Sequence, residues 1–142
     1  MFSRLLKLTR QLYVPVSWSI FTQIMLSLPG SLFSGPGLFK IPHLDKIAHL
    51  ILFGGLAMFW ILYYQFKKYP EPKNLPWIVL LVLSVYGVAI EFFQLYFIPN
   101  RSFDVWDIVA DICGAVLGYL ATIAIKKIAP VETGAVTKTN CL

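Results

Sequence analysis

The sequence predicts an all-α polytopic membrane protein, a bundle of four transmembrane helices. Of its 142 residues, 58% are hydrophobic and only 13% are charged, whereas charged residues make up about 25% of a typical soluble domain. The apolar residues are gathered in long blocks, which indicates that lipid surrounds much of the surface. A chain of this length corresponds to about one domain.

Four apolar segments carry this prediction. They run over about residues 12–28, 44–64, 75–97 and 105–125. Each of the last three holds 21–23 residues, enough to cross about 30 Å of hydrocarbon at ~1.5 Å per residue. The first is shorter and follows Arg4, Lys7 and Arg10, so a cleaved signal peptide is the alternative. No A-x-A-like site follows it, which favours a retained helix.

The remaining segments are polar or rich in helix breakers. Residues 1–130 are predicted to form a single transmembrane domain, and residues 131–142 a polar, disordered tail. Glycines and prolines between Pro29 and Pro42 predict a loop or a short interfacial element. The two cysteines do not make a disulfide framework, and Cys113, inside an apolar run, is predicted to be a small buried hydrophobe.

The basic residues predict the orientation. With four crossings, nine of the twelve Lys and Arg residues share one side, and Lys40, Lys46 and Arg101 lie on the other. The positive-inside rule then places both termini in the cytoplasm of a protein of the plasma (inner) membrane. The net charge of +5 comes from these clusters at helix ends. It forms no separate basic face, so nucleic acid is not an expected partner.

Most of the acidic residues are predicted to gather at one membrane face. Five of the seven lie at helix ends or inside apolar segments: Asp45, Glu91, Asp104, Asp107 and Asp111. Four further polar residues reach the same face: Lys46, His49, Gln94 and Arg101. By the count of basic residues, this face is extracytoplasmic.

The spacing of these residues predicts that they face the interior of the bundle. Asp45 and His49 are one helical turn apart, so Asp45 is expected to orient His49. The last segment carries a seam at steps of 3, 4, 3 and 4 residues: Asp104, Asp107, Asp111, Gly114 and Gly118. Gly114 and Gly118 form a G-x-x-x-G pair, which lets another helix approach closely.

Carboxylates inside a membrane segment mark a functional site, because a charge at mid-helix costs about 2.5–3.5 kcal/mol. The catalytic candidates are Asp45, His49, Glu91, Asp104 and Asp107, and the substrate-binding candidates are Lys46, Gln94, Arg101 and Asp111. Three chemistries fit the set. They are acid–base work by His49, a divalent cation held by the carboxylates with Arg101 on a substrate phosphate, and headgroup binding without turnover. A purely structural polar network is the alternative.

The ordered motifs resemble the VanZ-like family of membrane proteins over about residues 44–120. They are Asp45-Lys46-x-x-His49, Glu91-x-x-Gln94, Arg101-x-x-Asp104-x-x-Asp107, and the following Gly114 and Gly118. One departure is Asp111, where the family often has Asn, so the chain carries an extra negative charge there.

The resemblance implies a bacterial cell-envelope protein, in a family named after a member linked to resistance to the glycopeptide teicoplanin. The expected function is binding or modifying an amphipathic or lipid-linked substrate at the extracytoplasmic face. Membrane lipids and a lipid-linked or glycopeptide ligand are the expected partners, and an oligomer is compatible with the sequence. A non-catalytic binding or assembly module and a small ion-coupled carrier are the alternatives. The motifs leave open whether a reaction is catalysed.

Overall fold

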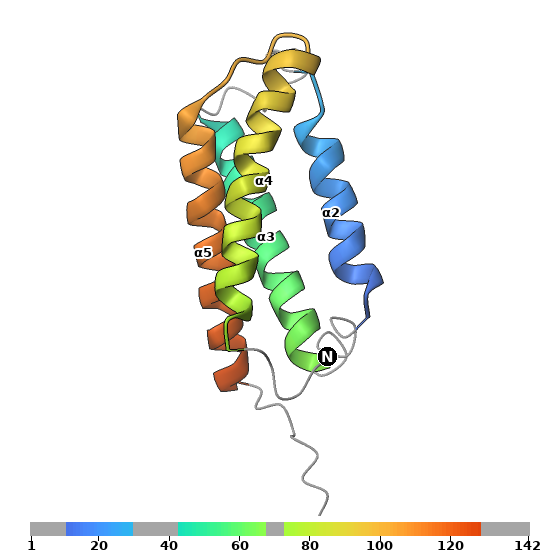
Figure 1. Cartoon of the computed structure of the whole chain (residues 1–142), viewed down its shortest axis with the longest axis vertical. Coiled ribbons are helices and arrows are strands. Elements are labelled where there is room, and N and C mark those ends of the chain that lie inside the picture. Colours follow the sequence, from blue (N-terminus) through green and yellow to red (C-terminus); the bar gives the residue numbers. More distant parts are fainter. Residues whose placement is uncertain (1–10, 30–42, 68–72, 129–142) are drawn as a thin grey trace, which may run out of the picture.

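The computed structural model describes residues 11–29, 43–67 and 73–128, and these residues are helical apart from short turns. The helices are α2 (Tyr13–Leu26), α3 (Leu44–Lys67), α4 (Leu75–Phe97) and α5 (Val105–Ile128). They lie side by side, and each runs opposite to the one before it in the chain (Figure 1). The predicted tail and most of the Pro29–Pro42 stretch lie outside the described residues.

Three of these helices are long and apolar enough to cross a membrane. The spans cover 22 residues of α3, 23 of α4 and 24 of α5. Helix α2 has 14 residues, or about 21 Å at ~1.5 Å per residue, against about 30 Å of hydrocarbon. The all-helical membrane architecture is therefore confirmed, and the crossing by α2 stays a prediction.

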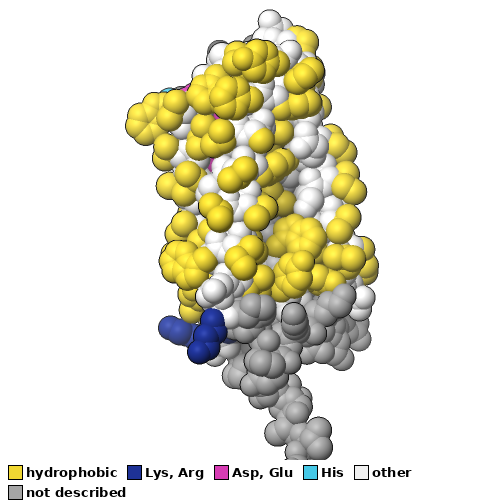
Figure 2. Space-filling view, viewed as in Figure 1, with side chains coloured by type: hydrophobic (Ala, Val, Ile, Leu, Met, Phe, Trp, Pro, Cys, Tyr) yellow, Lys and Arg dark blue, Asp and Glu magenta, His cyan; other side chains and the backbone are white. Residues whose placement is uncertain are grey.

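The surface is apolar and much of the buried interior is polar, the reverse of a soluble bundle. Trp77, Phe97 and Trp106 are each about 70% exposed, and hydrophobic side chains cover most of the face in Figure 2. Such a surface suits lipid, where every charged group has to be placed inside. Cys113 also lies exposed on α5, so its predicted burial was wrong, because an apolar residue of a membrane helix is equally at home facing lipid.

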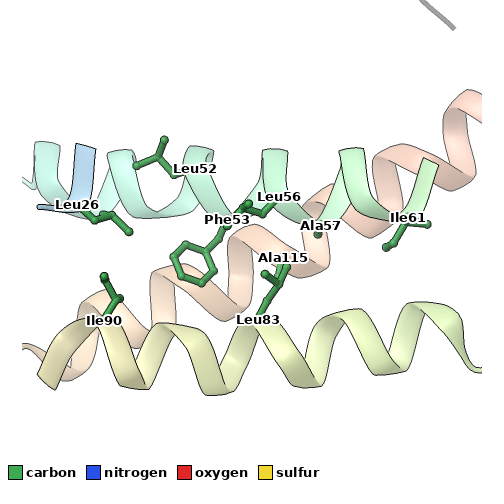
Figure 3. Packing of buried hydrophobic residues seen from close by; sticks show 9 residues of the cluster. All are labelled: Leu26, Leu52, Phe53, Leu56, Ala57, Ile61, Leu83, Ile90 and Ala115. Carbon is green, nitrogen blue, oxygen red and sulfur yellow. The ribbon is translucent and has the colours of Figure 1, made fainter. Parts of the chain in front are cut away.

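Helix α3 is central, since it packs against α2, α4 and α5. The buried hydrophobic cluster is drawn from all four helices (Figure 3): Leu26, Leu52, Phe53, Leu56, Ala57, Ile61, Leu83, Ile90 and Ala115. The Phe53 ring stacks with the rings of His49 and Tyr86, with centroids 6.5 and 5.5 Å apart. Phe53 therefore connects the apolar core with the polar residue His49.

Glycines bring α3 and α5 into backbone contact. A methyl group added at Gly114 would collide with the carbonyl of Leu50, and one at Gly118 with the carbonyl of Gly54. Such close approach is what a G-x-x-x-G pair permits. The predicted glycine pair thus lies at the crossing of α3 and α5, the most extensive helix contact in the described chain.

Helix α2 is attached by apolar packing of Trp18, Met25 and Leu26 against the core and by polar side chains. The Trp18 indole packs against Gly55 and donates a hydrogen bond to the Leu52 carbonyl at 3.0 Å. The Tyr86 hydroxyl on α4 donates to Gln23 Oε1 at 2.7 Å. These bonds replace the close backbone contact that joins α3 and α5.

Candidate functional site

The polar residues meet at the end of the bundle where α3 and α5 begin and α4 ends (Figure 1). Antiparallel α4 and α5 are joined by the short link of residues 98–104, so Glu91 near the end of α4 faces the first turns of α5. Lys46 and His49, in the first two turns of α3, complete the site. The predicted gathering of these residues at one end is what the structure describes.

His49 and Asp111 form the most deeply buried pair. His49 Nδ1 lies 2.9 Å from Asp111 Oδ1, and the two residues are 1% and 0% exposed. When Asp111 is ionised, its carboxylate can only accept, and His49 Nδ1 then carries the proton of this hydrogen bond. The lone pair of neutral His49 is then on Nε2, which has no hydrogen-bond partner.

The expected pairing of His49 with Asp45 does not occur. Asp45 lies one turn earlier, at the exposed start of α3, and its carboxylate accepts a hydrogen bond from Lys46 at 3.1 Å. His49 instead points inward to α5. Helical spacing predicts only neighbours within one helix, such as Asp45 and His49. It gives no information on a partner from another helix, such as Asp111.

Lys46 is held by three aspartates. Its Nζ lies 3.1 Å from Asp45, 2.6 Å from Asp104 and 3.0 Å from Asp107. The three hydrogen bonds use all three donors of an ammonium group. Lys46 was predicted as a substrate-binding residue, and in this structure it joins the starts of α3 and α5.

Asp104 is the N-cap of α5. Its Oδ1 accepts the backbone N–H of Trp106 at 2.8 Å, and its own backbone N–H donates to Glu91 Oε2 at 2.9 Å. The Lys46 hydrogen bond and then the Trp106 N–H hold the pKa of the Asp104 carboxyl below its ordinary value of 3.8. Asp104 therefore fixes the entry into α5 and positions Glu91.

Among the described residues, two groups of side chains could hold a metal ion. His49, Glu91 and Asp107 are all buried and offer ligand atoms within 4.8 Å of one another. Asp45, Asp104 and Asp107 form the second group, but Lys46 already occupies the space between them. Asp107 belongs to both: Oδ1 contacts Lys46, and Oδ2 lies 4.0 Å from His49 Nε2.

Gln94 lies away from this cluster. It is 1% exposed, and its Nε2 donates to the carbonyl of Leu26, the last residue of α2, at 2.9 Å. This carbonyl would otherwise be one of the unsatisfied acceptors at a helix end. Gln94 therefore ties α4 to the end of α2, although it was predicted to contact substrate.

An open pocket of about 520 Å³ leads from the end of the bundle to the cluster. Its polar lining includes His49, Arg101, Asp104 and Asp107. Its apolar lining consists of seven residues of α2 and α3: Phe21, Met25, Leu26, Leu44, Ala48, Ile51 and Leu52. Pockets with an apolar wall and a few converging polar groups are typical of ligand sites.

Sequence reasoning missed the apolar wall and two residues with unusual backbone geometry. His43 and Asn100 line the pocket with φ angles of 62° and 59°, a region that few residues other than glycine adopt. Asn is enriched there, so a turn signal existed at Asn100. For Phe21 and Ile51 there was no signal, because pocket-facing and lipid-facing apolar residues look alike in a sequence.

Comparison with known proteins identifies the family. No curated protein and no solved structure matches the chain. The model of the family described as VanZ/LLP1 matches residues 4–126. This match takes in α2, α3, α4, all but the last two residues of α5 and every residue of the site, so the chain belongs to the VanZ/LLP1 family.

Proposed function

We propose that this membrane protein binds an amphipathic molecule, with the apolar part against α2 and α3 and the headgroup at the polar cluster. The pocket of about 520 Å³ supports this proposal because its lining combines apolar residues of α2 and α3 with charged residues of the polar cluster. A ligand of uniform polarity would leave part of this lining unmatched. A lipid-linked precursor or a lipoglycopeptide has the required two-part chemistry.

The extracytoplasmic placement of the pocket is part of the proposal. Lys126 and Lys127 lie in the last turn of α5, at the opposite end from the acidic cluster, and Lys and Arg side chains appear at that end in Figure 2. The positive-inside rule assigns the lysine end to the cytoplasm. The pocket would then open to the outer leaflet, where a connection with glycopeptide resistance becomes physically reasonable.

A structural role for part of the cluster is favoured by the contacts themselves. Lys46 has its donors engaged, Asp104 caps a helix, and Gln94 binds a helix end. The contacts of these three residues hold helices together and explain why they are polar. The same contacts leave His49 Nε2 and Glu91 Oε1 without partners, so assembly alone does not explain the buried end of the site.

The test is to obstruct the pocket while leaving the bundle intact. Ile51→Trp adds bulk at a pocket-lining residue that is 56% exposed. Ile78→Trp is the matched control, because Ile78 is 54% exposed on α4 and does not line the pocket. With the full chain in nanodiscs, we expect a photoactivatable polyprenyl phosphate to label Ile51→Trp at least about tenfold less than wild type, in line with the loss of a few well-placed apolar contacts.

The control variant should label like wild type. Equal labelling of the two variants would contradict the proposal, and so would loss of labelling in both. A second arm uses teicoplanin as competitor, which distinguishes a glycopeptide ligand from a lipid-linked one. If neither probe binds wild-type protein above an empty nanodisc, the pocket does not serve these ligands.

A further inference from the structure

We propose that His49, Glu91 and Asp107 form a binding site for one divalent transition-metal ion, with Zn²⁺ as the best-suited metal. Each residue comes from a different helix: α3, α4 and α5. The inference deepens the proposed function, since the ion would lie at the inner end of the same pocket. It can nevertheless be tested without any amphipathic ligand.

The first support is the arrangement of ligand atoms. His49 Nε2 and Asp107 Oδ2 are 4.0 Å apart, which is within two metal–ligand bonds of about 2.0–2.2 Å each. Glu91 offers a carboxylate oxygen to the same group, in which one ligand atom from each of the three residues lies within 4.8 Å of the others. An ion bound at about 2.0–2.2 Å would draw the three side chains closer together. Three protein ligands with a further position open toward a pocket is the usual arrangement of a reactive zinc site.

The second support is a set of buried polar atoms that nothing in the described chain satisfies. His49 Nε2 and Glu91 Oε1 have no hydrogen-bond partner, and both residues are at most 1% exposed. Buried polar atoms are nearly always paired, so each exception calls for an explanation. A cation between them would satisfy both atoms at once.

The third support is the way His49 is held. Its Nδ1 donates to Asp111 Oδ1 at 2.9 Å, which fixes the ring and directs the Nε2 lone pair away from Asp111. A carboxylate behind a ligating histidine is the common outer partner in zinc proteins, where it sets the tautomer and raises the basicity of the ligand. Asp111 is therefore a positioning residue.

Charge and ligand type indicate the class of metal. Glu91, Asp107 and Asp111 are buried acids, and Lys46 contacts only Asp107 among them. Buried carboxylates require compensating positive charge. An imidazole with carboxylates suits Zn²⁺ better than Mg²⁺ or Ca²⁺, which prefer oxygen alone.

The pocket gives an ion a path to the site, and its excess of negative charge explains why a bound cation would be useful there. His49 and Asp107 line it, so an ion can reach the site from the end of the bundle. Five carboxylates at this end, Asp45, Glu91, Asp104, Asp107 and Asp111, outnumber Lys46 and Arg101. An anionic headgroup would be repelled by this excess, and a bound divalent cation would turn the inner end of the pocket into an acceptor for it.

The experiment compares the same substitution at the two histidines. His49→Asn keeps an N–H that can bond Asp111 but removes the atom at the Nε2 position. His43→Asn is the control, because His43 also lines the pocket and Asn tolerates its φ of 62°. The full chain, purified in detergent on a tag without histidines, is stripped with chelator and titrated with Zn²⁺ against a chromophoric competitor.

We expect about one zinc per wild-type chain, an affinity at least ~10-fold lower in His49→Asn, and an unchanged affinity in His43→Asn, by analogy with losses at known zinc sites. Zinc should also raise the unfolding temperature of wild type but not of His49→Asn. If His49→Asn does not fold, Glu91→Gln replaces it, since the amide oxygen still accepts from the Asp104 N–H. Absence of zinc from wild type, or equal losses at both histidines, would overturn the metal site without touching the lipid-labelling result.

Discussion

At the polar end of the bundle, some side chains have all their hydrogen bonds in contacts between helices, and others keep an atom that we propose binds a metal ion. Asp104 belongs to assembly, because it caps α5, pairs with Lys46 and positions Glu91 through its backbone. The metal-site proposal assigns His49 to binding, because one ring nitrogen is anchored and the other has no hydrogen-bond partner. The division follows from the number of hydrogen bonds that each residue has already made.

The acid sensitivity of the fold should depend in part on Asp104. The pKa of its carboxyl is lowered in the folded protein, so its stabilising contribution is complete above the unfolded value of about 3.9 and is lost as the pH falls through the lower folded value. Asp104→Asn keeps a good N-cap but has no proton to gain. We expect its unfolding temperature to fall less than that of wild type between pH 5 and about pH 3.

Thermal unfolding of both proteins in the same detergent at each pH measures this difference. Parallel curves would show that Asp104 does not contribute. Asp45→Asn provides a comparison at another Lys46 partner, one that lies at the exposed start of α3.

For individual residues, the sequence predicted which side chains gather at the polar end of the bundle better than it predicted which partners they contact. The acidic residues, His49 and Lys46 were all marked by being polar in apolar segments, which is costly unless they face inward. Their partners depend on how helices are rotated against one another. Asp111 therefore took the place expected for Asp45, and Gln94 turned out to bind the end of α2.

Among the helices, α3 and α5 form the fixed pair, joined by backbone contact at their glycines. Helix α2 is joined by side-chain hydrogen bonds and by the packing of Trp18, Met25 and Leu26 against the core. The polar site spans the fixed pair and α4. The apolar wall of the pocket, in contrast, includes three residues of α2: Phe21, Met25 and Leu26.

The glycine crossing should tolerate no added side chain at its tightest point. Gly118→Ala places a methyl group against the carbonyl of Gly54, and we expect a loss of about 1–3 kcal/mol in unfolding free energy from overpacking. Gly54→Ala is the graded control, because its nearest neighbour would be 3.2 Å away. Its cost should be smaller, partly offset by the ~1 kcal/mol helix preference of Ala over Gly.

Unfolding in a denaturing-detergent titration gives both values. A smaller effect at Gly118 than at Gly54 would mean that the crossing relaxes. The spacing of Gly114 and Gly118 was sufficient to predict a close helix contact, since that pattern has few other uses in a membrane helix. The spacing could not predict which helix would pack against the glycine pair.

The whole molecule combines a lipid-compatible exterior with a charged end. Hydropathy alone predicted the three long helices, with starts that match and ends within three residues for α3 and α5. It could not settle α2, whose length falls below a full span and whose polar side chains interrupt the apolar pattern. The lysine-rich end of α5 and the acidic end of the bundle point in opposite directions whether or not α2 crosses.

Orientation can be tested from outside the cell. In a background lacking Cys113 and Cys141, Ser102→Cys and Lys127→Cys place single thiols at exposed positions on the two ends of the bundle. We expect a membrane-impermeant maleimide to label Ser102→Cys in intact cells, and Lys127→Cys only after permeabilisation, as the positive-inside rule requires. The opposite pattern would invert the topology and place the pocket in the cytoplasm.

The shortness of α2 has a consequence for the surrounding lipid. A 14-residue helix presents about 21 Å of length beside neighbours that match about 30 Å of hydrocarbon. Acyl chains next to a short hydrophobic element must tilt or compress, which thins the leaflet locally. Thinning beside α2 would lower the headgroup layer toward Phe21 and Met25, the α2 side of the pocket. The bilayer itself would then present amphipathic molecules at the level of the pocket that we propose binds them.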